Sequence, residues 1–258
     1  MAVKSYLTVT EIPDDGASPE QMSMLYTRYH LAGTLSRGRD VLEVACGAGL
    51  GLGYLARRAR KVVAGDYDEA LLRRSRAHYL GRVRLLRLDA HSLPFASQSF
   101  DVVVLFEALY YLTDPARFID EARRVLRPCG VLVLCSANRE RPGFNPSPFA
   151  VRYFSLRELH ELLAARGFET ETYGGFPEEV SMLRGRAIVL ARKIAVCCHL
   201  IPSTMRGKAV LKRLLHGKIA VIPPEVQDEM SVLGELTPLA PDARAAAFKV
   251  LYAVARVS

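Results

Sequence analysis

The stretch DVLEVACGAGLGLGYLARRARKVVAGD, residues 40–66, determines how the rest of the chain is interpreted. Its first seven residues form a short apolar run that ends at Cys46, where glycines begin to recur at alternate positions. A helical pattern follows over 55–60, and a second apolar run closes at Asp66. This order of strand, glycine turn, helix and strand is typical of the first unit of a parallel α/β sheet.

The same alternation of strands and helices continues toward the carboxyl end. The run FDVVVLF at 100–106 is apolar at every position except Asp101, which indicates a strand covered on both faces. Right-handed crossovers between such strands produce a doubly wound sheet. We expect further strands over 82–88 and 130–136, and helices over 69–79, 115–126 and 155–167, the last two opened by Asp114 and Ser155.

The pattern changes after Gly167. Residues 168–173 and 248–257 alternate as strands do, but the segment between them is too long for a plain loop. We therefore predict an α/β, Rossmann-like, doubly wound sheet of seven strands, mostly parallel with an antiparallel last strand, and a helical cap inserted between the last two strands. The predicted boundaries are 1–176 and 246–258 for the core and 177–245 for the cap.

The composition is that of an ordinary globular protein. Half of the 258 residues are apolar and 24% are charged, which excludes a disordered, collagen-like or coiled-coil chain. Five cysteines without framework spacing, and no leader before Ser5, indicate a reduced, cytoplasmic protein. The sequence holds no run of about 18 uncharged apolar residues, so we expect no membrane span. No ligand spacing is typical of a metal site, so we predict no metal.

The formal net charge of +8 is concentrated in one segment. Nine basic residues and no acidic residue lie between Ser181 and Pro224, which leaves 26 basic against 27 acidic residues elsewhere. Three interpretations stay open: a solvated helical surface, a patch that contacts a membrane or a lipid-linked substrate, and a nucleic-acid face. The second would place the protein at the inner face of the membrane. Nucleic acid is least favoured, because 181–224 contains no aromatic residue for base stacking.

Acidic residues gather where the predicted strands end, which is the edge at which open α/β sheets bind ligands. Glu43 lies inside the first strand, and Asp66 closes the second, where a carboxylate can accept both hydroxyls of a ribose. Asp89 follows the third strand and precedes the segment LPF at 93–95. A dehydrogenase shares the glycine turn and the second-strand acid. However, its usual spacing is G-x-G-x-x-G, whereas the turn here reads GAGLG from Gly47.

Four segments together resemble the class I S-adenosylmethionine-dependent methyltransferases, specifically their type 11 small-molecule group. The resemblance covers about residues 23–175 and implies S-adenosylmethionine as cofactor and S-adenosylhomocysteine as product. The resemblance makes a dehydrogenase a much less favoured interpretation than a methyltransferase, because the Asp89 and LPF motifs have no role in a dehydrogenase. The segments are VLEVACGAGLG (41–51), VVAGDYDEALL (62–72), LDAHSLPFASQSFDVVVLFEALYYLTDP (88–115) and EARRVLRPCGVLVL (121–134).

The resemblance implies a role in cofactor binding for residues at each strand end. Glu43 and the turn at Gly47 and Gly49 would face the methionine part of the cofactor, with the carboxylate near its ammonium group. Asp66 would hold the ribose, and Tyr67 would lie on one face of the adenine. The expected cofactor-binding residues are Tyr29, Glu43, Ala45, Cys46, Gly47, Gly49, Asp66, Tyr67, Asp89, Ala90 and Phe106.

Other members of this set would lie around the adenine and the transferred methyl group. Asp89 would accept a hydrogen bond from the adenine amine, and Ala90 would offer backbone nearby. Phe106 would help to wall the methyl-transfer region. The segment LYTRY at 25–29 looks like the family's entry helix, whose Arg-Tyr pair lies close to the cofactor carboxylate. Simple packing of one helix face is the alternative for Tyr29.

A departure from the family pattern concerns the general base. Many relatives place a histidine pair just after the fourth strand, where this chain has Tyr110 and Tyr111. A histidine base at this position is therefore excluded. We expect Glu107, Tyr110 and Tyr111 to be the candidate catalytic residues. As alternatives, these residues only line the site, or the nucleophile ionises by itself.

The segment NRERPGFNPSPFAVRY at 138–153 is similar to one in methyltransferases of polysaccharide and cell-surface glycan pathways. Asn138, Asn145, Arg152 and Tyr153 would then face substrate; alternatively, the prolines only stiffen a connection. We expect methyl transfer to a small-molecule or glycan acceptor at oxygen, including a lipid-linked acceptor. Methylation of a quinone-like or secondary-metabolite ring at carbon or oxygen stays open, as does a cofactor-binding partner protein without catalysis. The sequence predicts no oligomeric state.

Overall fold

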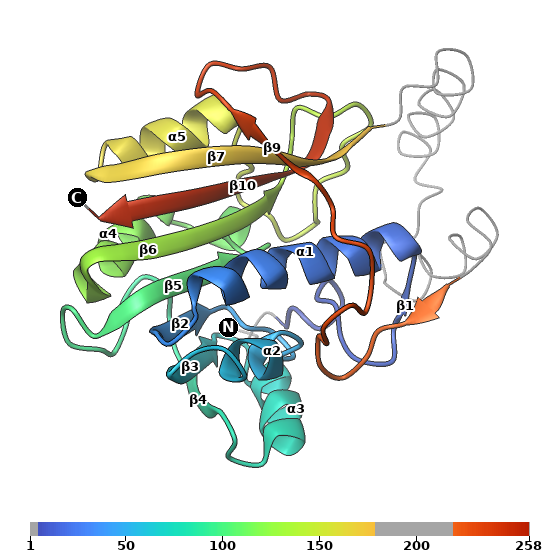
Figure 1. Ribbon diagram of the computed structural model, residues 1–258, viewed down its shortest axis with the longest axis vertical. Helices are drawn as coiled ribbons and strands as arrows, with labels where there is room; N and C mark the ends of the chain where they lie inside the picture. Colours follow the sequence, from blue (N-terminus) through green and yellow to red (C-terminus); the bar gives the residue numbers. More distant parts are fainter. Residues whose placement is uncertain (1–4, 179–218, 258) are drawn as a thin grey trace.

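The computed structural model describes residues 5–178 and 219–257. One large sheet runs through this part of the molecule and carries helices on both faces (Figure 1). Helices α1 (Pro19–Leu35), α2 (Leu52–Ala56) and α3 (Glu69–Tyr79) contribute to the apolar cluster on one face. Helices α4 (Pro115–Val125) and α5 (Leu156–Ala164) contribute to the cluster on the other. The predicted doubly wound α/β architecture is confirmed.

The sheet has the strand order β4-β3-β2-β5-β6-β10-β7-β9. Strands β2, β3, β4, β5 and β6 are mutually parallel, whereas β10 is antiparallel to both of its neighbours, β6 and β7. The predicted antiparallel last strand is therefore present. The bounds are β2 (Asp40–Val44), β3 (Lys61–Asp66), β4 (Arg84–Arg87), β5 (Phe100–Phe106), β6 (Leu126–Ala137), β7 (Phe168–Pro177), β9 (Leu236–Leu239) and β10 (Phe248–Val257).

Strand β5 shows why the central strands read as continuously apolar. Val102 and Val104 point into the cluster beneath α1 to α3, and Val103 and Leu105 point into the cluster beneath α4 and α5. All four side chains are fully buried. Because alternate side chains of a strand face opposite sides, a strand covered on both faces needs apolar residues at every position.

The helix starts follow the capping residues in the sequence. The side chain of Asp114 accepts the Arg117 N–H at the start of α4, and Pro115 occupies the first helical position. Ser155 and Glu158 form a capping box at the start of α5. These contacts satisfy backbone donors that the first helical turn leaves unpaired, so both predicted helix starts are confirmed.

The structure corrects two predictions, the number of strands and the helical character of the region before β10. The described sheet has eight strands, and the additional strand β9 pairs antiparallel with β7. Within the described residues 219–245 there is no helix. Strand β7 would otherwise leave its outer edge unpaired, and β9 fills that edge although its local sequence is no strong strand former. The predicted cap also includes 179–218, which lies outside the described residues.

The chain before β9 packs on the core instead of standing apart from it. Ile222 and Val226 are buried in the cluster beneath α1 to α3. Between them, Glu225 forms ion pairs with Arg57 and Arg82. Strand β8 (Ala220–Val221) pairs with β1 (Gly16–Ala17), and η1 (Leu109–Tyr111) is a single 3₁₀ turn. Within the described part of the chain, no helix combines the length and apolarity needed to cross a bilayer.

Tyr79 forms two of the hydrogen bonds that hold the glycine turn between β2 and α2 in place. The fully buried Tyr79 hydroxyl donates to the Gly49 carbonyl at 2.7 Å and accepts the Gly53 N–H at 2.9 Å. Gly49 has a φ of +81°, and an added Cβ would lie 2.8 Å from the Ser75 hydroxyl oxygen. Glycine at 49 therefore permits both the turn conformation and the close approach of α3.

We expect Tyr79→Phe to lower the free energy of unfolding by about 1–3 kcal/mol, because it leaves the buried Gly53 N–H without a partner and removes one of the two hydrogen bonds that the Gly49 carbonyl accepts. Urea denaturation measures the change. Tyr173→Phe is the matched control, since its hydroxyl donates to Glu171 near the surface. Equal losses in the two variants would contradict this account of the turn.

Candidate functional site

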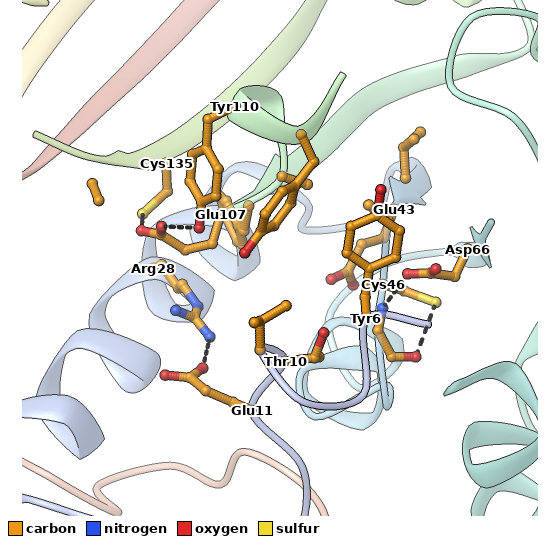
Figure 2. A pocket seen from close by; sticks show the side chains of 18 of the residues that line it. Tyr6, Thr10, Glu11, Arg28, Glu43, Cys46, Asp66, Glu107, Tyr110 and Cys135 are labelled. Carbon is orange, nitrogen blue, oxygen red and sulfur yellow. Dashed lines mark hydrogen bonds and ion pairs between the residues drawn. The ribbon is translucent and has the colours of Figure 1, made fainter. Parts of the chain in front are cut away.

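A cavity of about 760 Å³ opens where the parallel strands of the sheet end. Its walls come from the strand ends, helix α1, the start of β10 and the N-terminal segment 6–11 (Figure 2). The residues expected to bind the cofactor line this cavity, except for Gly49, whose carbonyl accepts the Tyr79 hydroxyl. Glu107, Tyr110 and Tyr111, expected at the reacting end, also line it. One cavity thus brings both predicted sets together.

Glu43 is a buried carboxylate with an incomplete set of partners. Its side chain is 2% exposed, and the Tyr29 hydroxyl donates to its Oε1 atom at 2.7 Å. The other oxygen, Oε2, has no hydrogen-bond partner in the described structure. Burial raises the pKa of Glu43 to about 7, although the Tyr29 hydrogen bond and the Arg28 charge lower it. A ligand ammonium at Oε2 would complete the carboxylate, as the expected cofactor requires.

Tyr29 reaches Glu43 because of a glycine that the sequence reasoning did not single out. The Tyr29 ring lies so close to Gly51 that an added Cβ there would meet the ring at 1.8 Å. The same ring contacts Phe106, with 5.4 Å between ring centroids. Tyr29 therefore contacts Glu43 at the cavity and also packs the helix face, while its expected role in binding the cofactor stays a prediction.

Asp66 holds the glycine turn from the end of β3. Its carboxylate accepts the Gly47 N–H and the Asp68 N–H, each at 2.8 Å. Burial raises the pKa of Asp66, and these two backbone hydrogen bonds oppose the rise. A carboxylate has about four acceptor positions, so Asp66 keeps acceptor capacity for a hydroxyl of a ribose.

The expected adenine end is more open. Tyr67 is half-exposed, and the Arg87 guanidinium lies 5.3 Å from its ring centroid. Asp89 accepts the backbone N–H of His91 at 2.9 Å and lies 2.7 Å from its Nδ1 atom. Burial alone would raise the pKa of Asp89, but these contacts hold it below its usual value. His91 Nε2 accepts the Asp114 N–H, so its Nδ1–H donates to Asp89, and the ring braces this acid.

Glu107 lies at the opposite end, directly after β5. It is a non-glycine residue with a φ of +50°, a conformation that is often retained at functional sites. Its carboxylate accepts the Tyr110 hydroxyl at 3.0 Å and the Cys135 thiol at 3.5 Å. Burial raises the pKa of Glu107, and the charge of Arg28 opposes that rise. A carboxylate with a raised pKa facing a cavity is suited to accept a proton.

The N-terminal segment closes the cavity over these residues, which the sequence reasoning did not foresee. The Tyr6 N–H donates to Asp68 at 2.7 Å, and the Tyr6 ring lies 5.2 Å from that of Tyr111. Further along, Glu11 forms an ion pair with Arg28. The expected strands, helices and motifs all begin after this segment, so none of them marked it as part of the site.

The residues expected to face substrate do not line the cavity. Asn138 is fully buried, and its amide nitrogen donates to the Ala245 and Phe248 carbonyls. Its side-chain oxygen accepts the Glu140 N–H, so the side chain joins the loop after β6 to the start of β10. Arg141 is the residue of the segment 138–153 that lines the cavity.

The other three expected substrate residues lie on or behind the wall. Asn145 is exposed, and Arg152 forms an exposed ion pair with Glu158. The Tyr153 ring stacks on the Tyr110 ring with centroids 4.2 Å apart, and so supports the wall from behind. The four residues thus lie outside the walls of this cavity, and their expected contact with a glycan stays a prediction.

Known proteins share both the sequence and the fold of this site. The Methyltransferase domain family matches residues 42–134. A Mycolicibacterium smegmatis protein described as a probable S-adenosylmethionine-dependent methyltransferase is 44% identical over 144 residues, 54% of this chain and 56% of that protein. The demethylmenaquinone methyltransferase of Clavibacter sepedonicus is 37% identical over 100 residues, 38% of this chain and 41% of that enzyme. This chain spans about half the length of the curated relatives it matches.

A solved structure supports the fold beyond the matched segment. The S-adenosylmethionine-dependent methyltransferase from Thermotoga maritima, described as a possible histamine N-methyltransferase, superposes with a TM-score of 0.59. The superposition covers 93% of this chain and 92% of that chain at 16% identity. At this identity the likeness concerns the fold alone.

We expect cofactor affinity to depend on pH through Glu43. Between pH 5.5 and 6.5 the α-amino group of S-adenosylhomocysteine stays protonated, while the free Glu43 carboxyl, with its pKa of about 7, is mostly protonated. Binding the ammonium requires the carboxylate, so affinity rises by up to about tenfold per pH unit in this window. Isothermal titration calorimetry measures it, with NAD as the control ligand.

Glu43→Gln is expected to bind S-adenosylhomocysteine more weakly and to remove most of this pH dependence. The amide keeps the size of the side chain but cannot lose a proton. Wild-type affinity that stays constant across the window would show that Glu43 does not receive the ammonium.

Proposed function

Because the chain carries a class I S-adenosylmethionine-dependent methyltransferase domain, we propose that the protein transfers the cofactor's methyl group to a hydroxyl oxygen of a small acceptor. One observation carries the proposal: a single cavity joins the set around Glu43 and Asp66 to the set around Glu107. The first set suits the polar groups of the cofactor. The second set presents a proton acceptor, which a hydroxyl nucleophile requires.

The residues of this chain would place the reactants and remove one proton. The sulfonium of the cofactor supplies an activated methyl group, so that a C–O bond forms as the C–S bond breaks. Glu43 and Asp66 would fix the position of the cofactor, and Tyr6 and Tyr111 would exclude water above the acceptor. Glu107 would accept the proton of the attacking hydroxyl, while Tyr110 donates a hydrogen bond to the same carboxylate.

The lining of the acceptor half favours a ring over a glycan. Four tyrosines and Met24 line it beside the charged Glu11, Arg28 and Glu107, so its walls suit a flat ring that carries a polar group. The tyrosines are Tyr6, Tyr110, Tyr111 and Tyr252. The four residues on which the glycan interpretation depended lie outside the cavity. The demethylmenaquinone methyltransferase among the relatives carries a ring acceptor in its name, which agrees with this choice. We therefore favour, as the methyl acceptor, a hydroxyl on a flat ring over a hydroxyl on a sugar.

Methyl transfer from labelled S-adenosylmethionine to two acceptor series tests the proposal. One series contains catechols and hydroquinones with apolar substituents, and the other contains simple glycosides. We expect product only in the first series. Product only from glycosides would restore the glycan interpretation, and tight cofactor binding without any turnover would favour the non-catalytic partner protein.

Glu107→Gln is expected to reduce kcat by about 10²- to 10⁴-fold, because the amide cannot accept the hydroxyl proton. The affinity for S-adenosylhomocysteine should stay unchanged, since Glu107 lies outside the expected cofactor set. Glu69→Gln is the matched control, because it removes an acid from an exposed ion pair with Arg76. An unchanged kcat in Glu107→Gln would show that another group accepts the proton.

A further inference from the structure

Three charged side chains meet in the acceptor half of the cavity, each from a different part of the chain. Glu11 comes from the N-terminal segment, Arg28 from α1, and Glu107 from the residue after β5. Figure 2 draws Arg28 between the two carboxylates, with its guanidinium joined to Glu11. The hydrogen bonds of Glu107 run instead to Tyr110 and Cys135. Glu11 and Glu107 thus both lie near the Arg28 guanidinium, and Glu11 forms the ion pair with it.

The cation in this cluster keeps its charge. Arg28 is 11% exposed at its side chain, and the neighbouring acids raise the already high pKa of the guanidinium despite its burial. A buried positive charge attracts any carboxylate within reach, because the surroundings screen it weakly. If Glu11 did not engage the guanidinium, the acids that still feel its charge would be Glu107 and Glu43, and Glu43 already accepts the Tyr29 hydroxyl. Paired with arginine, Glu107 would stay ionised and would be a weak base.

We propose that Glu11 is a positioning residue for methyl transfer: by engaging Arg28, it keeps the guanidinium from pairing with Glu107 and leaves Glu107 able to accept the acceptor's proton. This role rests on the proposed function of Glu107 as the base.

The groups that face Glu107 from each packed element determine in which direction its pKa moves when Glu11 is replaced. Burial raises the pKa of Glu107, whereas Arg28 of α1, the Tyr110 hydroxyl of η1 and the Cys135 thiol of β6 lower it. Glu11 raises it. Tyr252 of β10 lies behind the thiol and interacts with it. A neutral residue at 11 removes a charge that raises the pKa and frees a cation that lowers it, so both changes act in the same direction.

The titration of Glu107 in the full chain tests the proposal without any acceptor. Protein labelled with ¹³C at the glutamate side-chain carboxyls is titrated by NMR, and Glu107→Gln identifies the signal. We expect Glu11→Gln to move the Glu107 midpoint to lower pH by at least about one unit. Glu11→Asp keeps the charge and should leave the midpoint near the wild-type value. Glu161→Gln is the control, since it removes an acid from an exposed ion pair with Arg157.

A double variant separates the route through Arg28 from the direct effect of the Glu11 charge. Arg28 acts on Glu107 more strongly than Glu11 does. Removal of both charges in Glu11→Gln/Arg28→Gln should therefore raise the midpoint above that of wild type. A midpoint below wild type in the double variant, or no downward movement in Glu11→Gln, would overturn the proposal.

The outcome of this titration is independent of the proposed function. An unproductive acceptor search leaves the Glu107 midpoints unaffected, and unchanged midpoints leave methyl transfer intact. Once an acceptor is known, the acidic limb of kcat/KM should move to lower pH in Glu11→Gln. A merely structural role for Glu11 would reduce kcat/KM at every pH and leave the limb in place, which would also overturn the proposal.

Discussion

The carboxylate of Asp66 ties the end of β3 to two other parts of the site by accepting the backbone N–H groups of Gly47 and Asp68. The first hydrogen bond holds the glycine turn, and the second places Asp68. Asp68 in turn accepts the Ala70 N–H at the start of α3 and the N–H of Tyr6. Turn, helix and N-terminal cover therefore share one chain of hydrogen bonds, in which each donor would be unsatisfied without the next acceptor.

Two further acids, Glu43 and Glu107, are buried although burial of a carboxylate costs stability and folding does not need an acid at either position. Burial raises the pKa of each, and neither forms an ion pair with a basic residue in the described structure. Apolar side chains of similar volume would stabilise such positions at least as well. Carboxylates kept in apolar surroundings beside a cavity are typical of sites that bind cations or move protons. These two buried carboxylates agree with the proposed binding end of the cavity at Glu43 and its proposed reacting end at Glu107.

The parts of the fold that follow from local pattern were predictable. The mostly apolar runs at 40–46, 61–66 and 100–106 contain strands, because a strand buried on both faces needs apolar residues at most of its positions. Glu43 and Asp66 are buried exceptions, and both line the cavity. Asp114 and Ser155 became helix caps, because a short polar side chain satisfies the first free N–H groups of a helix. By contrast, β9 pairs with an edge that exists only once β7 is in place, so its own residues did not indicate a strand.

By itself the sequence determined the α/β sheet, the glycine turn and the acids at the strand ends, because spacing along one strand or helix places these groups directly. Only the tertiary structure decided which distant residues complete the site. It brings Glu11 to Arg28 across 17 positions of the chain, sets Arg28 against Glu107, and turns Asn138 away into a structural bridge. Such contacts join segments that share no local period, so they depend on how the whole chain packs and on no pattern within any one element.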